Sequence, residues 1–301
     1  MIDAKLIAQI ADAVIAELGG ERANTPVAST PSPIAATAAN TDIASAPSRD
    51  ITGEASRAEV LVEQPFDREA IERMKTRTNA RIGVGRAGAR YNTQTLLTLR
   101  ADHAAARDAV FLDVEPNVLD ALGMFTVESR CADKNEFLTR PDLGRQLSDE
   151  AIATLREHCT MNPDVQIFAS DGLSSTAVGA NLPKLLPVLM DGLKTKGLSV
   201  GTPFFVKNGR VGIMERVGEL LGARVVCVLL GERPGLATAE SMSAYVAYNP
   251  RVGMEESRRT VISNIHRGGI PAVEAGAYLA DLIKTVFDAR ASGVDLRRDA
   301  A

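Results

Sequence analysis

The stretch that decides the fold runs Gly201-Thr202-Pro203-Phe204-Phe205-Val206, passes through Gly209-Arg210-Val211, and reaches Gly231-Glu232-Arg233-Pro234-Gly235. Its pattern predicts a strand, a turn, a helix, a second strand and then a glycine-rich turn that carries a carboxylate. In parallel sheets, ligands bind outside the carboxyl ends of the strands. The side chain of Glu232 is therefore a candidate for contact with a ligand.

The same alternation of strand and helix extends over the C-terminal half of the chain. Apolar runs predict strands over residues 165–169, 203–206, 224–230 and 243–248. Helical periodicity predicts helices over residues 148–159, 183–196, 214–221 and 271–289. This order is typical of a doubly wound, mostly parallel (Rossmann-like) sheet with both faces covered. We therefore expect an α/β domain over residues 148–301.

The N-terminal half has a different character. The sequence pattern predicts a smaller helical part over residues 59–147. Its expected helices run over 65–80 and 93–106, and irregular, charged connections are expected over 126–135 and 138–145. Residues 21–58 predict a flexible, disordered linker, because a segment of Ala, Thr, Ser and Pro cannot bury enough apolar surface to offset its ordering entropy.

Residues 1–20 predict a short amphipathic helix that ends at a glycine pair. Its apolar side chains recur at helical spacing: Leu6, Ile7, Ile10, Val14 and Leu18. One interpretation is a detachable recognition helix on a tether, and the other is a terminal helix that docks on its own domain. The length of the linker favours the recognition helix.

Composition excludes several classes of protein. The chain has 301 residues and a net charge of -4, so it lacks the basic balance that nucleic-acid binding requires. It has no apolar run of roughly 20 residues, so we expect no membrane span, and no secretory signal is visible. Its 3 Cys are widely spaced and it has only 3 His, which predicts no metal site and a reducing, cytoplasmic compartment.

Residues 83–88 form a literal G-x-G-x-x-G with glycines at 83, 85 and 88. A dinucleotide fingerprint needs a strand before it, whereas several basic residues precede this one. We interpret the match as coincidental, and a nicotinamide-dependent dehydrogenase stays as a second hypothesis. The sequence contains no G-x-S-x-G elbow and no phosphate-binding P-loop.

Two loops at predicted strand ends carry a carboxylate beside a glycine. At Glu232, ligand contact and an ion pair with a neighbouring Arg are equally open interpretations. At Asp171, capping of the following helix is favoured over ligand contact, because Leu173-Ser174 leads into a predicted helix start.

Several unusual peptides occur in one order between residues 80 and 293. They lie at 85–88, 138–145, 162–166, 170–174, 200–206, 231–236 and 263–269. On these peptides the chain resembles the small (light) subunit of ethanolamine ammonia-lyase over most of its length. The resemblance implies an adenosylcobalamin-dependent lyase that converts ethanolamine to acetaldehyde and ammonia.

The resemblance also implies a division of labour between two subunits. The large subunit, a β/α barrel, binds the substrate, and the small subunit holds the corrin ring from the other side. This chain is then expected to carry no catalytic residue. The cofactor contacts of the family fall on Val211, Glu232 and Val261 of this sequence. Val261 departs from relatives that carry Cys at the matching position.

His266 needs a separate interpretation. Residues 264–269 nearly match a D-x-H-x-x-G motif in which the histidine binds cobalt, but Asn264 stands where that motif has Asp. The family resembled keeps the cofactor's own base on cobalt. We therefore expect His266 to be structural or interfacial.

The resemblance to this family also implies a location in the cell. Its N-terminal helix directs the enzyme into a bacterial microcompartment, so residues 1–20 are expected to bind a shell protein, and the chain is expected inside such a compartment in the cytoplasm. The alternative function is a non-catalytic assembly or scaffold protein of an ethanolamine-utilising microcompartment.

Overall fold

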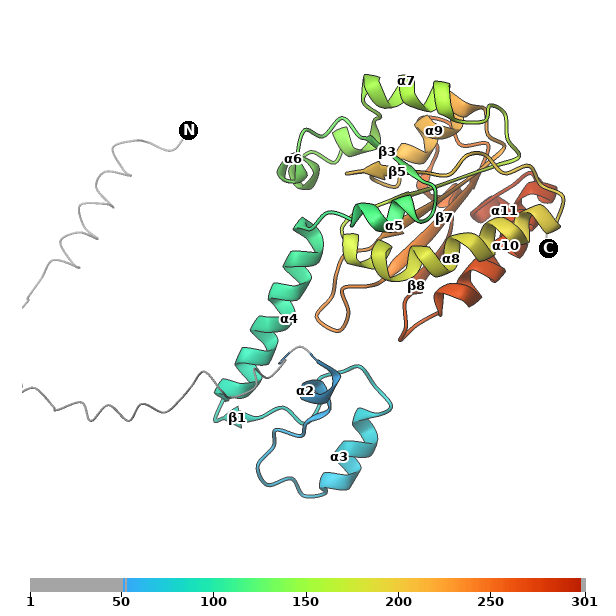
Figure 1. The fold of residues 1–301 in the computed structure, drawn as a ribbon. Helices are drawn as coiled ribbons and strands as arrows, with labels where there is room; N and C mark the ends of the chain where they lie inside the picture. Colours follow the sequence, from blue (N-terminus) through green and yellow to red (C-terminus); the bar gives the residue numbers. More distant parts are fainter. Residues whose placement is uncertain (1–50, 52, 299–301) are drawn as a thin grey trace, which may run out of the picture. The chain divides into compact units, whose positions relative to one another are not determined.

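The computed structural model describes residues 51 and 53–298 (Figure 1). The chain divides into two compact units, Met1–Arg49 and Asp50–Ala301, and the described residues belong to the second. The predicted helix over residues 1–20 and nearly all of the predicted linker lie outside the described residues. No helix in the described part is long and apolar enough to cross a membrane.

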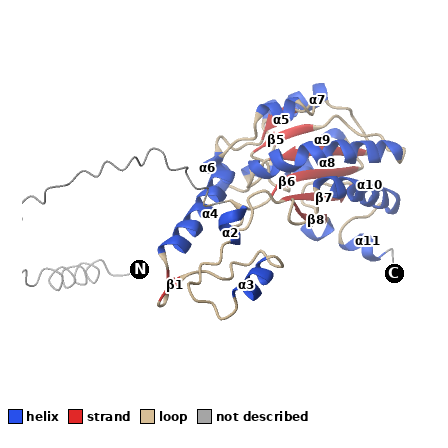
Figure 2. Ribbon diagram, turned by 60° about the horizontal axis from the view of Figure 1, so that its bottom comes forward, coloured by secondary structure: helices blue, strands red, loops and turns tan. Residues whose placement is uncertain are grey.

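A six-stranded, mostly parallel sheet forms the centre of the second unit (Figures 1 and 2). Its order is β3-β5-β4-β6-β7-β8. The first four strands in this order are parallel, and β7 and β8 add antiparallel neighbours. The bounds are β3 Phe125–Glu128, β4 Val165–Ser170, β5 Phe204–Lys207, β6 Val225–Gly231, β7 Met242–Tyr248 and β8 Thr260–Ile265. The expected α/β class with a mostly parallel sheet is confirmed.

Helices cover both faces of this sheet, because the central strands are apolar on both sides. Residues of α8 (Ser175–Thr195) and α10 (Ala272–Ala289) join one apolar cluster with the sheet, and α7 (Asp149–His158) and α9 (Ile213–Leu221) join the other. Figure 1 shows α7 and α9 above the sheet and α8 and α10 below it. Every residue of β4 and β6 is buried, so these two strands form the centre of the core.

The part of this unit before residue 148 combines several helices with long connections. It contains α2 (Glu54–Ala58), α3 (Arg68–Lys75), α4 (Thr93–Phe111), α5 (Pro116–Asp120) and α6 (Lys134–Thr139). The first helix, at residues 54–58, falls inside the predicted flexible linker, so that prediction is wrong for these residues. A small hairpin of β1 (Arg86–Ala87) and β2 (Arg90–Tyr91) precedes α4. The short helix α11 (Val294–Arg298) ends the described chain.

The predicted irregular connection over residues 126–135 is wrong. Phe125–Glu128 forms the edge strand β3, and residues Lys134–Thr139 form α6. Three of the four β3 residues are at least partly exposed, so an edge strand of this kind leaves only a weak apolar pattern. The sheet therefore takes a strand from the region that we expected to be helical, before residue 148.

The predicted start of a helix at Pro183 is also wrong, because α8 begins at Ser175 and contains Pro183 and Pro187 in its interior. The cap is Ser174, whose side chain accepts a hydrogen bond from the backbone N–H of Ala177 at 3.1 Å. Proline usually marks a first turn. Here the packing of α8 against both the sheet and α10 sustains a long helix in spite of two prolines.

The G-x-G-x-x-G stretch lies in a loop and in the β1–β2 hairpin, and no strand of the main sheet leads into it. Gly85 is instead needed for packing: a Cβ there would lie 2.1 Å from the Asn92 side chain, which caps α4. A dinucleotide fingerprint follows directly on a strand of the main sheet, and this stretch does not, which agrees with the interpretation of the match as coincidental.

Candidate functional site

Asp171 follows β4 and is a buried junction between three segments. Its carboxylate accepts hydrogen bonds from Lys134 Nζ at 2.6 Å, from the backbone N–H of Asn208 at 2.7 Å and from Ser170 Oγ at 3.2 Å. The prediction that Asp171 caps the following helix is wrong, because Ser174 is the cap. The carboxylate instead joins α6 to the turn that follows β5.

That turn carries Val211, the first of the three expected cofactor contacts. Arg210, the residue before it, donates to the carbonyl of Phe137 at 2.7 Å and lies over the Phe137 ring at 4.2 Å. Burial lowers the pKa of the Arg210 guanidinium from its ordinary value. Val211 is half-buried and packs against the apolar cluster on the α7 and α9 face of the sheet.

Glu232 directly follows β6 and is half-buried. Its backbone N–H donates to Ser241 O at 2.9 Å, and its Oε1 accepts a hydrogen bond from the Tyr245 hydroxyl at 2.7 Å. Within the described part of the chain, no Lys or Arg forms an ion pair with Glu232. The sequence left open an ion pair between Glu232 and a neighbouring Arg. The described residues do not form that pair.

Val261 lies on the edge strand β8 and is 43% exposed. It pairs with Tyr245 on β7, and Tyr245 in turn pairs with Val228 on β6. Residues directly opposite each other in antiparallel strands share a face of the sheet. Tyr245 and Val211 pack against the same apolar cluster. The structure therefore brings all three expected contacts to one face of the sheet.

A buried charge network lies beside these residues, and nothing in the local sequence pattern indicated it. The guanidinium of Arg259, whose side chain is 8% exposed, binds the carboxylate of Glu215 and lies 3.6 Å from Glu256. Glu215 also accepts a hydrogen bond from Gly253 N at 2.9 Å. The Nε of Arg259 is buried and has no hydrogen-bond partner among the described residues. This network fixes the segment that leads into β8.

His266 follows β8, and one of its ring nitrogens is used within its own turn. Its Nδ1 accepts a hydrogen bond from the backbone N–H of Gly268 at 3.1 Å. This contact supports a structural role for the imidazole. In the described ranges, no group of three or more His, Cys, Asp and Glu side chains is arranged to hold a metal ion.

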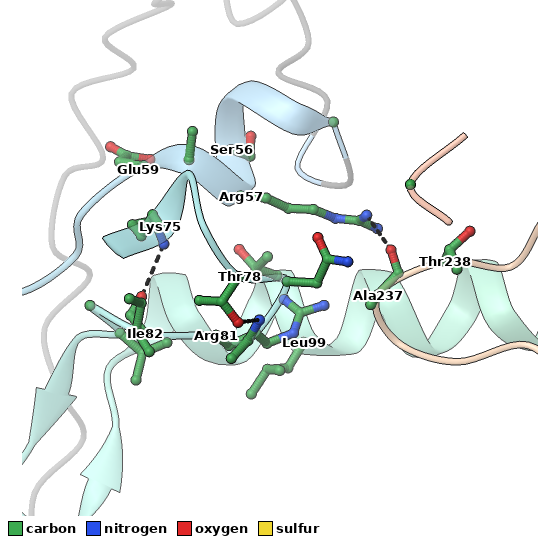
Figure 3. Close-up of a pocket in the computed structure, with 18 of the residues that line it drawn as sticks. Ser56, Arg57, Glu59, Lys75, Thr78, Arg81, Ile82, Leu99, Ala237 and Thr238 are labelled. Carbon is green, nitrogen blue, oxygen red and sulfur yellow. Dashed lines mark hydrogen bonds between the residues drawn. The ribbon is translucent and has the colours of Figure 1, made fainter. Parts of the chain in front are cut away.

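A separate cavity of about 1150 Å³ lies between the N-terminal helical part and the loops after β6 and β8 (Figure 3). The Arg57 guanidinium points to Ala237 O, 2.7 Å away, and Lys75 Nζ donates to Ile82 O at 2.9 Å. Arg57 and Arg81 both bind the buried carboxylate of Asp102. Val211, Glu232 and Val261 are absent from the cavity wall. Arg57 and Arg81 in this wall instead donate hydrogen bonds to backbone carbonyls of the loop that follows Glu232.

Comparison with known proteins identifies a family. The model of the ethanolamine ammonia-lyase light chain (EutC) matches residues 68–297. A protein of Clostridium tetani named ethanolamine ammonia-lyase small subunit is 57% identical over 248 residues, which cover 82% of this chain and 84% of that protein. A protein of Listeria monocytogenes with the same name is 46% identical over 289 residues, which cover 96% of this chain and 98% of that protein.

Proposed function

This chain belongs to the family of ethanolamine ammonia-lyase small subunits, and we propose that it holds adenosylcobalamin against a β/α-barrel large subunit. In this proposal the assembled complex converts ethanolamine to acetaldehyde and ammonia. When bound, the cofactor supplies the radical that starts the reaction. The small subunit supplies binding surface and orientation, and the large subunit supplies the substrate site.

The observation that carries this proposal is the shared sheet face of Val211, Glu232 and Val261. Val261 offers exposed apolar surface on an edge strand, and Val211 offers a half-buried apolar side chain beside a fixed turn. Glu232 adds a carboxylate whose second oxygen has no protein partner among the described residues. A flat ring with amide side chains needs this combination of apolar contact and hydrogen-bond acceptors.

The roles of these residues follow from their chemistry. The carboxylate of Glu232 accepts hydrogen bonds from amide or hydroxyl groups of the cofactor. Val261 and Val211 exclude water from the edge of the ring and gain stability from buried apolar area. The backbone at Val261 provides the same surface whether the side chain is Val or Cys, so the difference from other relatives is compatible with binding.

The first prediction tests the division of labour between the subunits. We expect the purified chain to show no turnover of ethanolamine, and activity to appear when the large subunit and adenosylcobalamin are added. The measurement is acetaldehyde formation, together with copurification of the two chains and the visible absorption of bound cobalamin. Turnover by this chain alone would contradict the proposal. Copurification without bound cobalamin, and without turnover, would favour a non-catalytic assembly protein.

The second prediction concerns Glu232→Ala. Loss of a charged acceptor should weaken cofactor binding by about 1.5–3 kcal/mol, which is roughly 10- to 150-fold in Kd. Titration of the reconstituted complex with adenosylcobalamin measures this change, and the KM for ethanolamine should stay nearly constant. Glu240→Ala is the matched control, because Glu240 is an exposed carboxylate of the same loop. Unchanged cofactor affinity in Glu232→Ala would refute the assignment.

The third prediction concerns residues 1–20, which we propose to be an address read by a microcompartment shell protein. An amphipathic helix of this length is marginal alone and needs a partner surface. Deletion of residues 1–20 should leave assembly and turnover intact and abolish shell association. A fluorescent protein fused to these residues should gain that association. Loss of assembly or activity on deletion would instead place the segment in the catalytic fold.

A further inference from the structure

We propose that Tyr245 is a positioning residue, which fixes the direction of the Glu232 carboxylate toward the cofactor. This inference rests on the proposed function of Glu232. Tyr245 lies on β7, opposite Val261, with its hydroxyl 2.7 Å from Glu232 Oε1. Tyr245 therefore connects two of the three expected contacts: its hydroxyl binds Glu232, and its backbone pairs with Val261.

The need for such a residue comes from the position of Glu232. The carboxylate stands on a flexible side chain at the end of a strand, and no cation among the described residues orients it. A single donor on a stiff aromatic ring restricts that freedom, because Tyr has only two side-chain torsions and its ring packs into the apolar cluster. The conformational entropy of the Glu232 side chain is then lost when the chain folds, so cofactor binding does not have to offset it.

The hydrogen bond also leaves acceptor capacity for a ligand. A carboxylate has about four lone-pair sites, and the Tyr245 hydroxyl uses one of them on Oε1. Burial, and then the hydrogen bond to Glu232, raise the pKa of Tyr245 above its ordinary value. The hydroxyl therefore stays protonated at neutral pH and remains a donor. It cannot repel the carboxylate by becoming charged.

The surroundings hold Tyr245 in place. Burial and the hydrogen bond to Glu232 raise the pKa of Tyr245, and the charge of Arg259 acts in the opposite direction. Arg259 is itself anchored by Glu215, and Gly253 donates to that same carboxylate. On the neighbouring strand, Val228 pairs with Tyr245 in the fully buried β6. The ring is thus held by the pairing of its strand on both sides and by the apolar cluster into which it packs.

A double-mutant cycle tests this role in the complex reconstituted with the large subunit. Tyr245→Phe removes only the hydroxyl and should raise the Kd of adenosylcobalamin roughly 3- to 10-fold. In a Glu232→Ala background, the same substitution should change Kd by less than about twofold, because the group it acts through is gone. The readout is the absorbance change of the cofactor on binding, which does not require turnover.

Controls separate this role from a structural one. Tyr248→Phe alters a tyrosine of the same strand that packs on the opposite face, and should leave Kd unchanged. An equal loss of affinity from Tyr245→Phe in both backgrounds would show a merely structural effect and overturn the inference. So would an unchanged Kd in Tyr245→Phe when Glu232→Ala weakens binding. If the wild-type complex binds no cobalamin, the proposed function itself fails.

Discussion

Replacement of Asp171 by alanine is expected to destabilise the protein by about 3–5 kcal/mol, the usual result of removing one partner of a buried ion pair. Lys134, whose side chain is 12% exposed, would lose its partner in the interior. The backbone N–H of Asn208 would lose its acceptor as well. Because Asn208 begins the turn that carries Val211, cofactor affinity should fall together with stability.

Urea unfolding followed by circular dichroism measures this loss. The matched control is Asp113→Ala, which breaks the ion pair between Lys207 and a carboxylate that is 62% exposed. Exposed pairs contribute little, so this substitution should cost less than about 1 kcal/mol. A similar loss of stability in both variants would show that burial of Asp171 is not what makes its ion pair important.

Gly231→Ala is expected to have an effect as large, through steric overlap. A Cβ on Gly231 would lie 2.0 Å from the carbonyl oxygen of Ser174 and 2.4 Å from that of Asp171. Both are backbone atoms and cannot swing away as a side chain would. We expect a loss of more than about 3 kcal/mol, or a chain that fails to fold. Glu232 is the next residue, so any variant that folds should bind cofactor weakly.

Gly235→Ala provides the comparison within the same loop. The nearest atom to its added Cβ is 3.8 Å away, which is an ordinary contact. This substitution should change the free energy of unfolding by no more than about 0.5 kcal/mol. Soluble yield, protease resistance and urea unfolding of the two variants measure the difference. Equal behaviour of Gly231→Ala and Gly235→Ala would mean that β6 does not approach the loop after β4 so closely.

The antiparallel direction of β7 is indicated by the length of the connection that precedes it. Between Gly231 and Met242 the chain has only ten residues and no helix. A parallel crossover needs a dozen or more residues, usually with a helix. The length of this connection therefore already indicates an antiparallel strand. The sequence pattern of β8 is a weaker signal for a strand, since most of its residues are half-buried or exposed at the sheet edge.

The sequence alone determined the α/β class, the two central strands and the family. The mostly apolar runs over 165–169 and 224–230 are typical of strands that are buried on both faces, and helices that end in glycine separate them. Glu232 could be identified as a candidate because it follows such a run. These properties are local, so they can be read from neighbouring residues.

Only the tertiary structure decided which side chains meet. The partner of Asp171 is Lys134, far upstream in the chain, and the partner of Glu232 is Tyr245 across a loop. Strand register then places Val261 opposite Tyr245. A shift of one residue in that register would turn Tyr245 or Val261 to the other face. Such pairings depend on register and on burial summed over distant segments, which no local pattern contains.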